Sequence, residues 1–149
     1  MTYDEIRLSF QGYQERREKI KLLYIELLSN LEQLELMKMT DENIQTKYSL
    51  ITLDDSTIDR LLIDLYVLIS KNPNLVRNLL QIRRQVKIIN NAIKIFFSRV
   101  GLPMTNIAQI IQEHNIATNE KLETLRPMLV NTMQIISTEF GFQNPFSAE

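Results

Sequence analysis

Apolar residues recur along the first third of the chain at alternating spacings of four and three. This spacing places them on one face of an α-helix, and a repeat of seven residues is the pattern of a coiled-coil heptad. We therefore predict a helix over about 3–39, roughly 50 Å long at about 1.5 Å per residue. Its apolar face, here called the first seam, consists of Ile6, Phe10, Tyr13, Arg17, Ile20, Tyr24, Leu27, Leu31 and Leu34.

A second seam with the same spacing lies in the middle of the chain, and all of its positions are apolar. It predicts a helix from Pro73 to Val100, because Asn72 can cap the free N–H groups and proline is tolerated in the first turn. Gly101 favours a stop directly afterwards. The second seam consists of Leu75, Leu79, Ile82, Val86, Ile89, Ile93, Phe96 and Val100.

The segments between and after these helices predict shorter elements. Residues 40–53 break the helical spacing, and Leu50–Leu53 is expected to lie extended on the core. Asp54–Thr57 has the capping and acidic residues that open a helix, which we expect to run to Asn72.

The last part of the chain predicts two more helical segments. A short segment over 104–114 is followed by a connector at Asn115–Asn119, in which Thr118 caps the final helix. Pro127 predicts either a kink in that helix or a helix start near Leu125. The final helix is expected to end at Gly141.

Together these elements predict an all-α fold, a four- to five-helix antiparallel bundle with long heptad-patterned first and third helices. Three glycines and four prolines are too few for the frequent turns of a β-sandwich or barrel. We expect one domain over 1–141 and a C-terminal tail over 142–149. The tail is expected to fold back on the bundle, the alternative being an exposed apolar patch for a partner.

The first helix is predicted to be longer than the middle helix that could cover it. Part of the first seam is therefore expected to be exposed and to form a coiled-coil-like homodimer through Phe10, Tyr13, Arg17 and Ile20. A charge at a seam position is costly unless it pairs or reaches water. Arg17 thus sets the register, receives an acidic partner, or lies in solvent where the helix projects.

Charge is distributed unevenly, although 17 basic and 18 acidic residues give a net charge of -1. No Asp or Glu occurs over 65–112, which holds seven basic residues. Four of these form a stripe away from the second seam, namely Arg77, Arg84, Lys87 and Lys94. The stripe predicts a face for nucleic acid, an anionic membrane surface or an acidic protein.

The alternative for this stripe is neutralisation inside the bundle by acidic side chains of neighbouring helices. Glu26, Glu32 and Asp59 are the candidate partners. No aromatic or glycine-rich element is interleaved with the stripe, so it has little resemblance to a dedicated nucleic-acid motif.

Most catalytic chemistries lack their residues in this chain. There is no cysteine and one histidine, so thiolate sites, disulfides and histidine metal clusters are excluded. Three isolated glycines form no phosphate-binding loop. His114 has no recognisable nucleophile to serve as a general base. We expect no catalytic, cofactor-binding or metal-binding residues and no cofactor, and hence a protein that is not an enzyme.

The sequence thus predicts a non-enzymatic interaction or scaffold module that acts through helix faces and self-associates. The alternative is an accessory protein that binds an anionic partner through its basic third helix. The chain begins without a basic, apolar leader and contains no apolar run long enough for a transmembrane helix. With no cysteine, it is expected in the cytoplasm.

Overall fold

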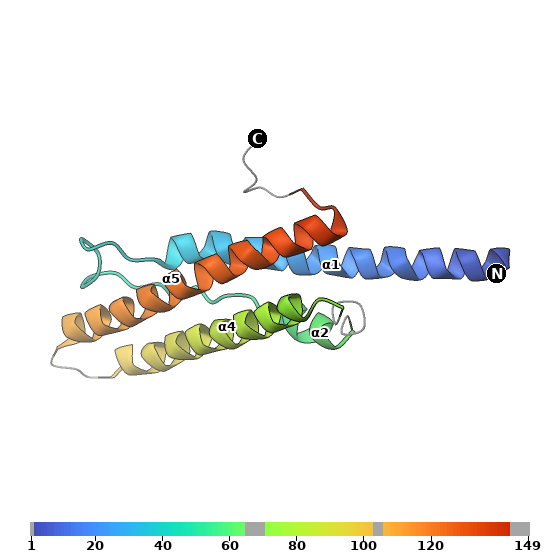
Figure 1. Cartoon of the computed structure of the whole chain (residues 1–149). Helices are drawn as coiled ribbons and strands as arrows, with labels where there is room; N and C mark the ends of the chain where they lie inside the picture. Colours follow the sequence, from blue (N-terminus) through green and yellow to red (C-terminus); the bar gives the residue numbers. More distant parts are fainter. Residues whose placement is uncertain (1, 65–70, 103–105, 144–149) are drawn as a thin grey trace.

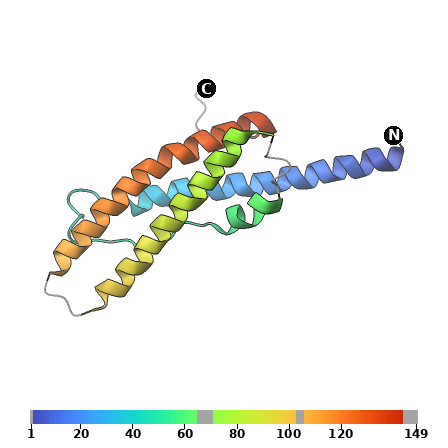
Figure 2. The same cartoon turned by 60° about the horizontal axis from the view of Figure 1, so that its bottom comes forward.

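The computed structural model describes residues 2–64, 71–102 and 106–143, and these residues form helices and irregular connections without a strand. The bounds of the helices are α1 Tyr3–Met37, α2 Ser56–Asp64, α4 Pro73–Val100 and α5 Ile107–Phe140. The all-α prediction is therefore confirmed. In Figures 1 and 2, α4 and α5 lie side by side, and α1 extends well beyond both of them at its N-terminal end.

The ends of the long helices are capped as their sequences favour. Thr2 and Glu5 form a reciprocal capping box at the start of α1: Thr2 Oγ1 accepts from the Glu5 N–H at 3.2 Å, and Glu5 Oε2 accepts from the Thr2 N–H at 2.8 Å. Asn72 caps α4 as predicted, accepting from the Leu75 N–H at 3.1 Å. α1 ends at Met37, two residues before the predicted end.

The core lies where α1, α2, α4 and α5 meet. Every member of the second seam except Val100 is buried, and Leu79 and Ile89 have no exposed surface. The first seam contributes its C-terminal half, Ile20 to Leu34, while α5 contributes Leu125, among others. Since burial of a Leu or Ile side chain stabilises a fold by about 1.5–3 kcal/mol, this shared core accounts for the packing of the four helices.

α5 corrects the prediction for the last part of the chain. It runs unbroken from Ile107 to Phe140, so the connector at Asn115–Asn119 and the helix start near Leu125 were wrong. Asn115 and Thr118 are polar, yet both are buried. Asn115 lies four residues after the buried Ile111, and Thr118 lies three residues after Asn115, so both continue the apolar face of α5 rather than interrupting it.

The connection between α1 and α2 meets the core at one residue of the predicted run Leu50–Leu53. Leu53 is buried, whereas Leu50, Ile51 and Thr52 are exposed, and residues 41–46 form turns. α2 begins at Ser56, where Asp54 Oδ1 accepts from the Ser56 N–H at 3.1 Å. The remainder of the helix expected to run to Asn72 falls mainly on residues 65–70, outside the described residues.

Candidate functional site

The N-terminal part of α1, Tyr3–Arg16, is here called the projecting segment. Every residue in it is exposed except Gly12, which is partly exposed. Figure 1 shows this segment as the blue end of α1, extending past the ends of the other helices. Since an isolated helix of this length is marginal in water, the segment depends on its capping box and on its continuity with the packed half of α1.

The projecting segment carries three apolar residues of the first seam. The exposed fractions of Ile6, Phe10 and Tyr13 are 53%, 62% and 51%. These side chains have the same four-and-three spacing as the buried half of the seam, so they form one apolar stripe along the helix. Two of the four predicted self-association residues, Phe10 and Tyr13, are therefore available on the surface.

Arg17 marks the boundary between the exposed and the packed half of the seam. Its Nη2 donates to the carbonyl oxygen of Phe140 at 3.3 Å, and its guanidinium lies 4.8 Å from the centre of the Phe142 ring. The last carbonyls of a helix carry partial negative charge, so a cation is favoured there. Arg17 is therefore neither simply solvated nor turned towards a separate acidic partner: it contacts the end of α5 and the start of the tail.

Ile20, the fourth predicted self-association residue, is fully buried within the chain. It is therefore not available for a partner, because α5 and the tail cover the seam from this point. Tyr24 shows how the tail reaches it: its ring lies 5.8 Å from that of Phe142, and its hydroxyl donates to the Gln143 carbonyl at 3.2 Å. The predicted tail thus begins folded back at Phe142, while 144–149 lie outside the described residues.

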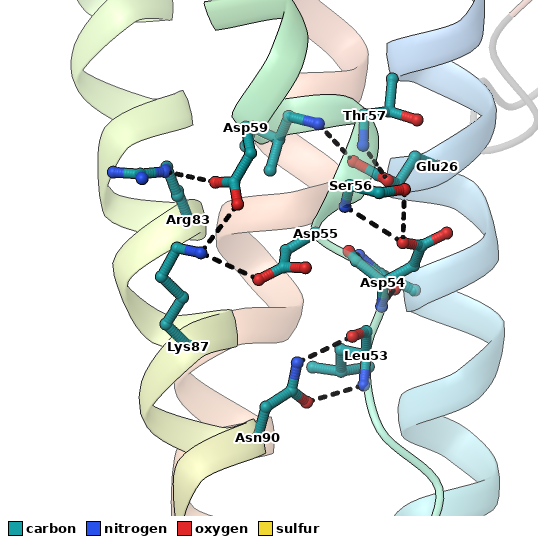
Figure 3. Close-up of polar contacts among 12 residues, drawn as sticks. Glu26, Leu53, Asp54, Asp55, Ser56, Thr57, Asp59, Arg83, Lys87 and Asn90 are labelled. Carbon is teal, nitrogen blue, oxygen red and sulfur yellow. Dashed lines mark hydrogen bonds and ion pairs between the residues drawn. The ribbon is translucent and has the colours of Figure 1, made fainter.

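One member of the predicted basic stripe is paired inside the fold. Lys87 Nζ lies 3.0 Å from Asp55 Oδ2 and 2.8 Å from Asp59 Oδ2, and Arg83 Nε lies 2.5 Å from Asp59 Oδ1 (Figure 3). The hydrogen bonds from Lys87 and Arg83 hold the pKa of Asp59 below its ordinary value of 3.8. These ion pairs join α4 to the start of α2, so the charge of Lys87 is neutralised by Asp55 and Asp59 of the same chain.

The other three members of the stripe remain accessible. Arg77, Arg84 and Lys94 are exposed and form no hydrogen bond or ion pair with another residue in the described ranges. Exposed apolar side chains, Leu80 and Ile95, lie on the same helix. The stripe is thus reduced to three accessible cations on a helix that also exposes apolar side chains.

A carboxylate from α1 caps α2 from inside the protein. Glu26 is buried, and its two oxygens accept from the N–H groups of Thr57 and Ile58, both at 2.8 Å (Figure 3). Burial raises the pKa of Glu26, and the two backbone hydrogen bonds oppose that rise. Glu26 therefore anchors α2 and does not neutralise the basic stripe.

Four asparagines hold the connection between α1 and α2 against the helices. Asn30 forms two hydrogen bonds with the backbone of Asp54, and Asn90 forms two with the backbone of Leu53. In each case Nδ2 donates to the carbonyl oxygen and Oδ1 accepts from the N–H group, at 2.7–2.8 Å. Asn119 does the same at Met39, at 2.9 and 3.0 Å. Asn115 donates to two carbonyls of the connection. Side-chain amides thus form hydrogen bonds with this irregular backbone, as a neighbouring strand would in a sheet.

Sequence reasoning did not identify these asparagines. The usable signal is a polar residue that falls on an apolar seam, as Asn115 does, because a buried amide needs a hydrogen-bond partner. Asn30 and Asn90 show no such signal in the seams as predicted. Their backbone partners lie 24 and 37 residues away in the chain.

The remaining features of the described residues are a partly buried histidine and an open hollow. The described residues contain no group of three or more His, Cys, Asp or Glu side chains that could hold a metal ion. His114 stacks on Phe96 with ring centres 3.9 Å apart, and burial, followed by the charge of Lys121, lowers its pKa. An open hollow of about 750 Å³ lies beside α4. Its lining is part apolar and part polar or charged, namely Leu50, Leu53, Ile93 and Phe97 together with Thr52, Asp54, Asp55, Asn90 and Lys94.

No protein-family model matches the chain, and no curated protein or solved structure is significantly similar to it. Among the helices in the described part of the chain, none has the length and apolar character needed to cross a membrane.

Proposed function

We propose that this protein is a non-enzymatic helical interaction module that self-associates through the projecting segment. In this proposal α1, α2, α4 and α5 form one antiparallel bundle, a rigid base from which the segment extends into solvent. The observation that carries the proposal is the exposed stripe of Ile6, Phe10 and Tyr13, which continues the seam of the core without a partner in the described chain. Exposed apolar stripes of this kind typically mark protein contacts.

The chemistry of the described residues supports this reading over an enzyme. Two of their buried polar side chains, Glu26 and Asn30, form hydrogen bonds with backbone N–H and carbonyl groups and so have a structural role. Because the chain has no cysteine to form disulfides, we propose a cytoplasmic setting.

Sedimentation velocity of the wild-type chain from micromolar to submillimolar concentration tests the proposal. We expect a concentration-dependent shift from monomer to dimer, and Phe10→Gln should move that shift to higher concentration. Leu8→Gln is the matched control, because Leu8 has the same exposed fraction of 62% on the same helix but lies off the seam. A wild-type chain that stays monomeric throughout, or equal effects of the two variants, would contradict the proposal.

A second candidate function rests on the free cations of α4. Arg77, Arg84 and Lys94 could bind an anionic partner, since no acid in the described residues pairs with them. Titration of labelled DNA, RNA and anionic vesicles at low salt tests this directly. On duplex DNA, each phosphate contact should add about 0.9 to the slope of log affinity against log salt.

The charge-reversal variant for that test is Arg84→Glu, which should weaken binding without unfolding the protein because Arg84 is exposed. Arg60→Glu is the control, an equal change in net charge at an exposed position on α2. Absence of binding to all three probes would remove the second candidate and leave the first unaffected.

A further inference from the structure

Resting on the second candidate function, we infer that the anionic partner of α4 is a lipid surface. The arginines of α4 would contact the anionic headgroups, and aliphatic side chains of the same helix face would enter the headgroup layer between them. The order of basic and apolar residues along α4, together with the charges that flank them, favours lipid over nucleic acid and over an acidic helix.

Six residues lie on the side of α4 opposite the second seam. They follow one another at intervals of three and four residues, which places them within an arc of about 80° at about 100° per residue. All six are exposed, and they extend over about 27 Å of helix. They are here called the outer face of α4, namely Arg77, Leu80, Arg84, Ile88, Asn91 and Ile95.

Three members of the outer face are aliphatic. The exposed fractions of Leu80, Ile88 and Ile95 are 49%, 38% and 52%. They are eight and seven residues apart, so each heptad has one apolar residue, whereas a helical partner requires two, at the a and d positions. A lipid headgroup layer imposes no such spacing, because each aliphatic side chain enters it separately. The spacing therefore favours a lipid surface over a partner helix.

The charges of the outer face are all positive. Arg84 lies four residues from both Leu80 and Ile88, so a cation and aliphatic side chains share one surface. Neither Arg77 nor Arg84 forms an ion pair with another residue in the described ranges. Near an anionic bilayer the cations attract headgroups, and the aliphatic side chains gain by leaving water. Nucleic acid would use the arginines alone, because the outer face has no aromatic residue on which a base could stack.

The flanks of the outer face do not cancel this positive charge. On the flank towards α2, three acids are matched by three cations, and the ion pairs in Figure 3 join two of each. The acids are Asp54, Asp55 and Asp59, and the cations are Arg83, Lys87 and Lys94. The opposite flank carries the uncharged residues Gln81, Gln85 and Ala92. Arg77 and Arg84 therefore supply the charge that attracts an anionic surface.

Co-sedimentation of the full-length chain with vesicles at low salt tests the lipid surface. The vesicles consist of phosphatidylcholine with about 30 mol% phosphatidylserine, and pure phosphatidylcholine vesicles are the comparison. We expect binding to the anionic vesicles alone. Arg84→Gln should weaken that binding about fivefold, the effect of one cation near an anionic surface. Arg16→Gln, at an exposed arginine of α1, is the matched control and should leave the binding unchanged.

A substitution of an aliphatic residue separates lipid from nucleic acid. Ile95→Gln should weaken vesicle binding about fivefold through lost apolar contact, and should leave the affinity for labelled duplex DNA unchanged. Ile25→Gln is the matched control, because Ile25 lies on α1 with an exposed fraction of 51%, against 52% for Ile95. Circular dichroism of each variant checks that the helices remain folded.

The expected result is vesicle binding that Arg84→Gln and Ile95→Gln both weaken and that neither control changes. Binding of DNA or RNA at least as tight as binding of the anionic vesicles would overturn the lipid surface as the partner and leave the second candidate function intact. Equal effects of Ile95→Gln and Ile25→Gln on vesicle binding would do the same. Absence of binding to all three probes would instead remove the second candidate function itself.

Discussion

The two halves of α1 have the same seam but opposite environments. From Ile20 to Leu34 the seam residues are buried against α2 and α5, whereas from Ile6 to Tyr13 they are more than half exposed. The four-and-three spacing of the seam is the same on both sides of the change. The difference shows that a heptad pattern specifies an apolar helix face but does not specify which chain, or which copy of the chain, covers it.

The boundary between the halves is Arg17, the one charged member of the seam. In sequence it is an interruption, while in the structure it is the residue that contacts the end of α5 and the Phe142 ring. A charge at this position suits a place where a helix terminus approaches a seam, because carbonyls and an aromatic face both attract a guanidinium.

We expect the largest difference between the two halves in unfolding free energy, measured with one alanine substitution in each half of the seam. Leu27→Ala, in the buried half, should destabilise the protein by about 2–5 kcal/mol through lost burial and the cavity left behind. Tyr13→Ala, in the exposed half, should change the monomer's stability by about 0.5 kcal/mol or less. Urea unfolding at concentrations below dimerisation measures both, and similar losses for the two variants would show that the halves are not distinct.

A polar residue of the buried half should have the next largest effect. Glu26→Ala leaves the part-buried N–H group of Thr57 and the buried N–H group of Ile58 without their acceptor, and we expect a loss of about 1–3 kcal/mol in unfolding free energy. Glu32→Ala, at an exposed position of the same helix, is the control and should be nearly neutral. Equal stabilities of the two variants in urea would rule out Glu26 as the anchor of α2.

Substitution of Arg17, at the boundary between the two halves, should lower the unfolding free energy by less. Arg17→Met keeps an apolar stem but removes the charge from the Phe140 carbonyl and the Phe142 ring, with an expected loss of about 1 kcal/mol. Amide hydrogen exchange should also become faster at Phe142, since the tail loses a contact. Arg16→Met is the control, because Arg16 is exposed and precedes Arg17 by one residue. An equal increase in exchange at Phe142 in the Arg16→Met variant would argue against a specific role of Arg17.

The smallest effect is expected from pH, on the side of the molecule away from the projecting segment. Burial against Phe96 lowers the pKa of His114 below 6.5, so the unfolded chain takes up its proton first as the pH falls. The unfolding free energy should therefore decrease as pH falls below about 6.5, and level off once both states are protonated. Urea midpoints of wild type and His114→Gln between neutral and mildly acidic pH test this, and parallel curves would contradict it.

Much of the fold could be predicted from the sequence because its signals are local. The seam over Pro73–Val100, the cap at Asn72 and the helix opening after Asp54 each depend on residues within a few positions of one another. The connector at Asn115–Asn119 was wrong for the same reason. Judged from neighbouring residues alone, the polar residues after Ile111 end the apolar pattern. In the folded chain, the backbone of the connection lies beside Asn115 and accepts two hydrogen bonds from its side chain.

The candidate site was predictable only in part. Phe10 and Tyr13 were identified because the predicted first helix is longer than the middle helix that could pack against it. That argument uses helix length alone. Ile20 was included wrongly, since the reach of α5 and the tail along α1 depends on packing between residues more than a hundred positions apart. Lys87 was grouped with Arg84 by helical spacing, and the approach of Asp59 from α2 separates them.

The sequence by itself determined the helices, their apolar faces and the absence of cysteine chemistry, because helix periodicity and composition are properties of short stretches of chain. The tertiary structure decided which half of the first seam is covered and which cations of α4 are paired. It also placed the backbone held by Asn30 and Asn90. These outcomes depend on where one helix ends against another, and that position is set by the packing of the whole core rather than by any local run of residues.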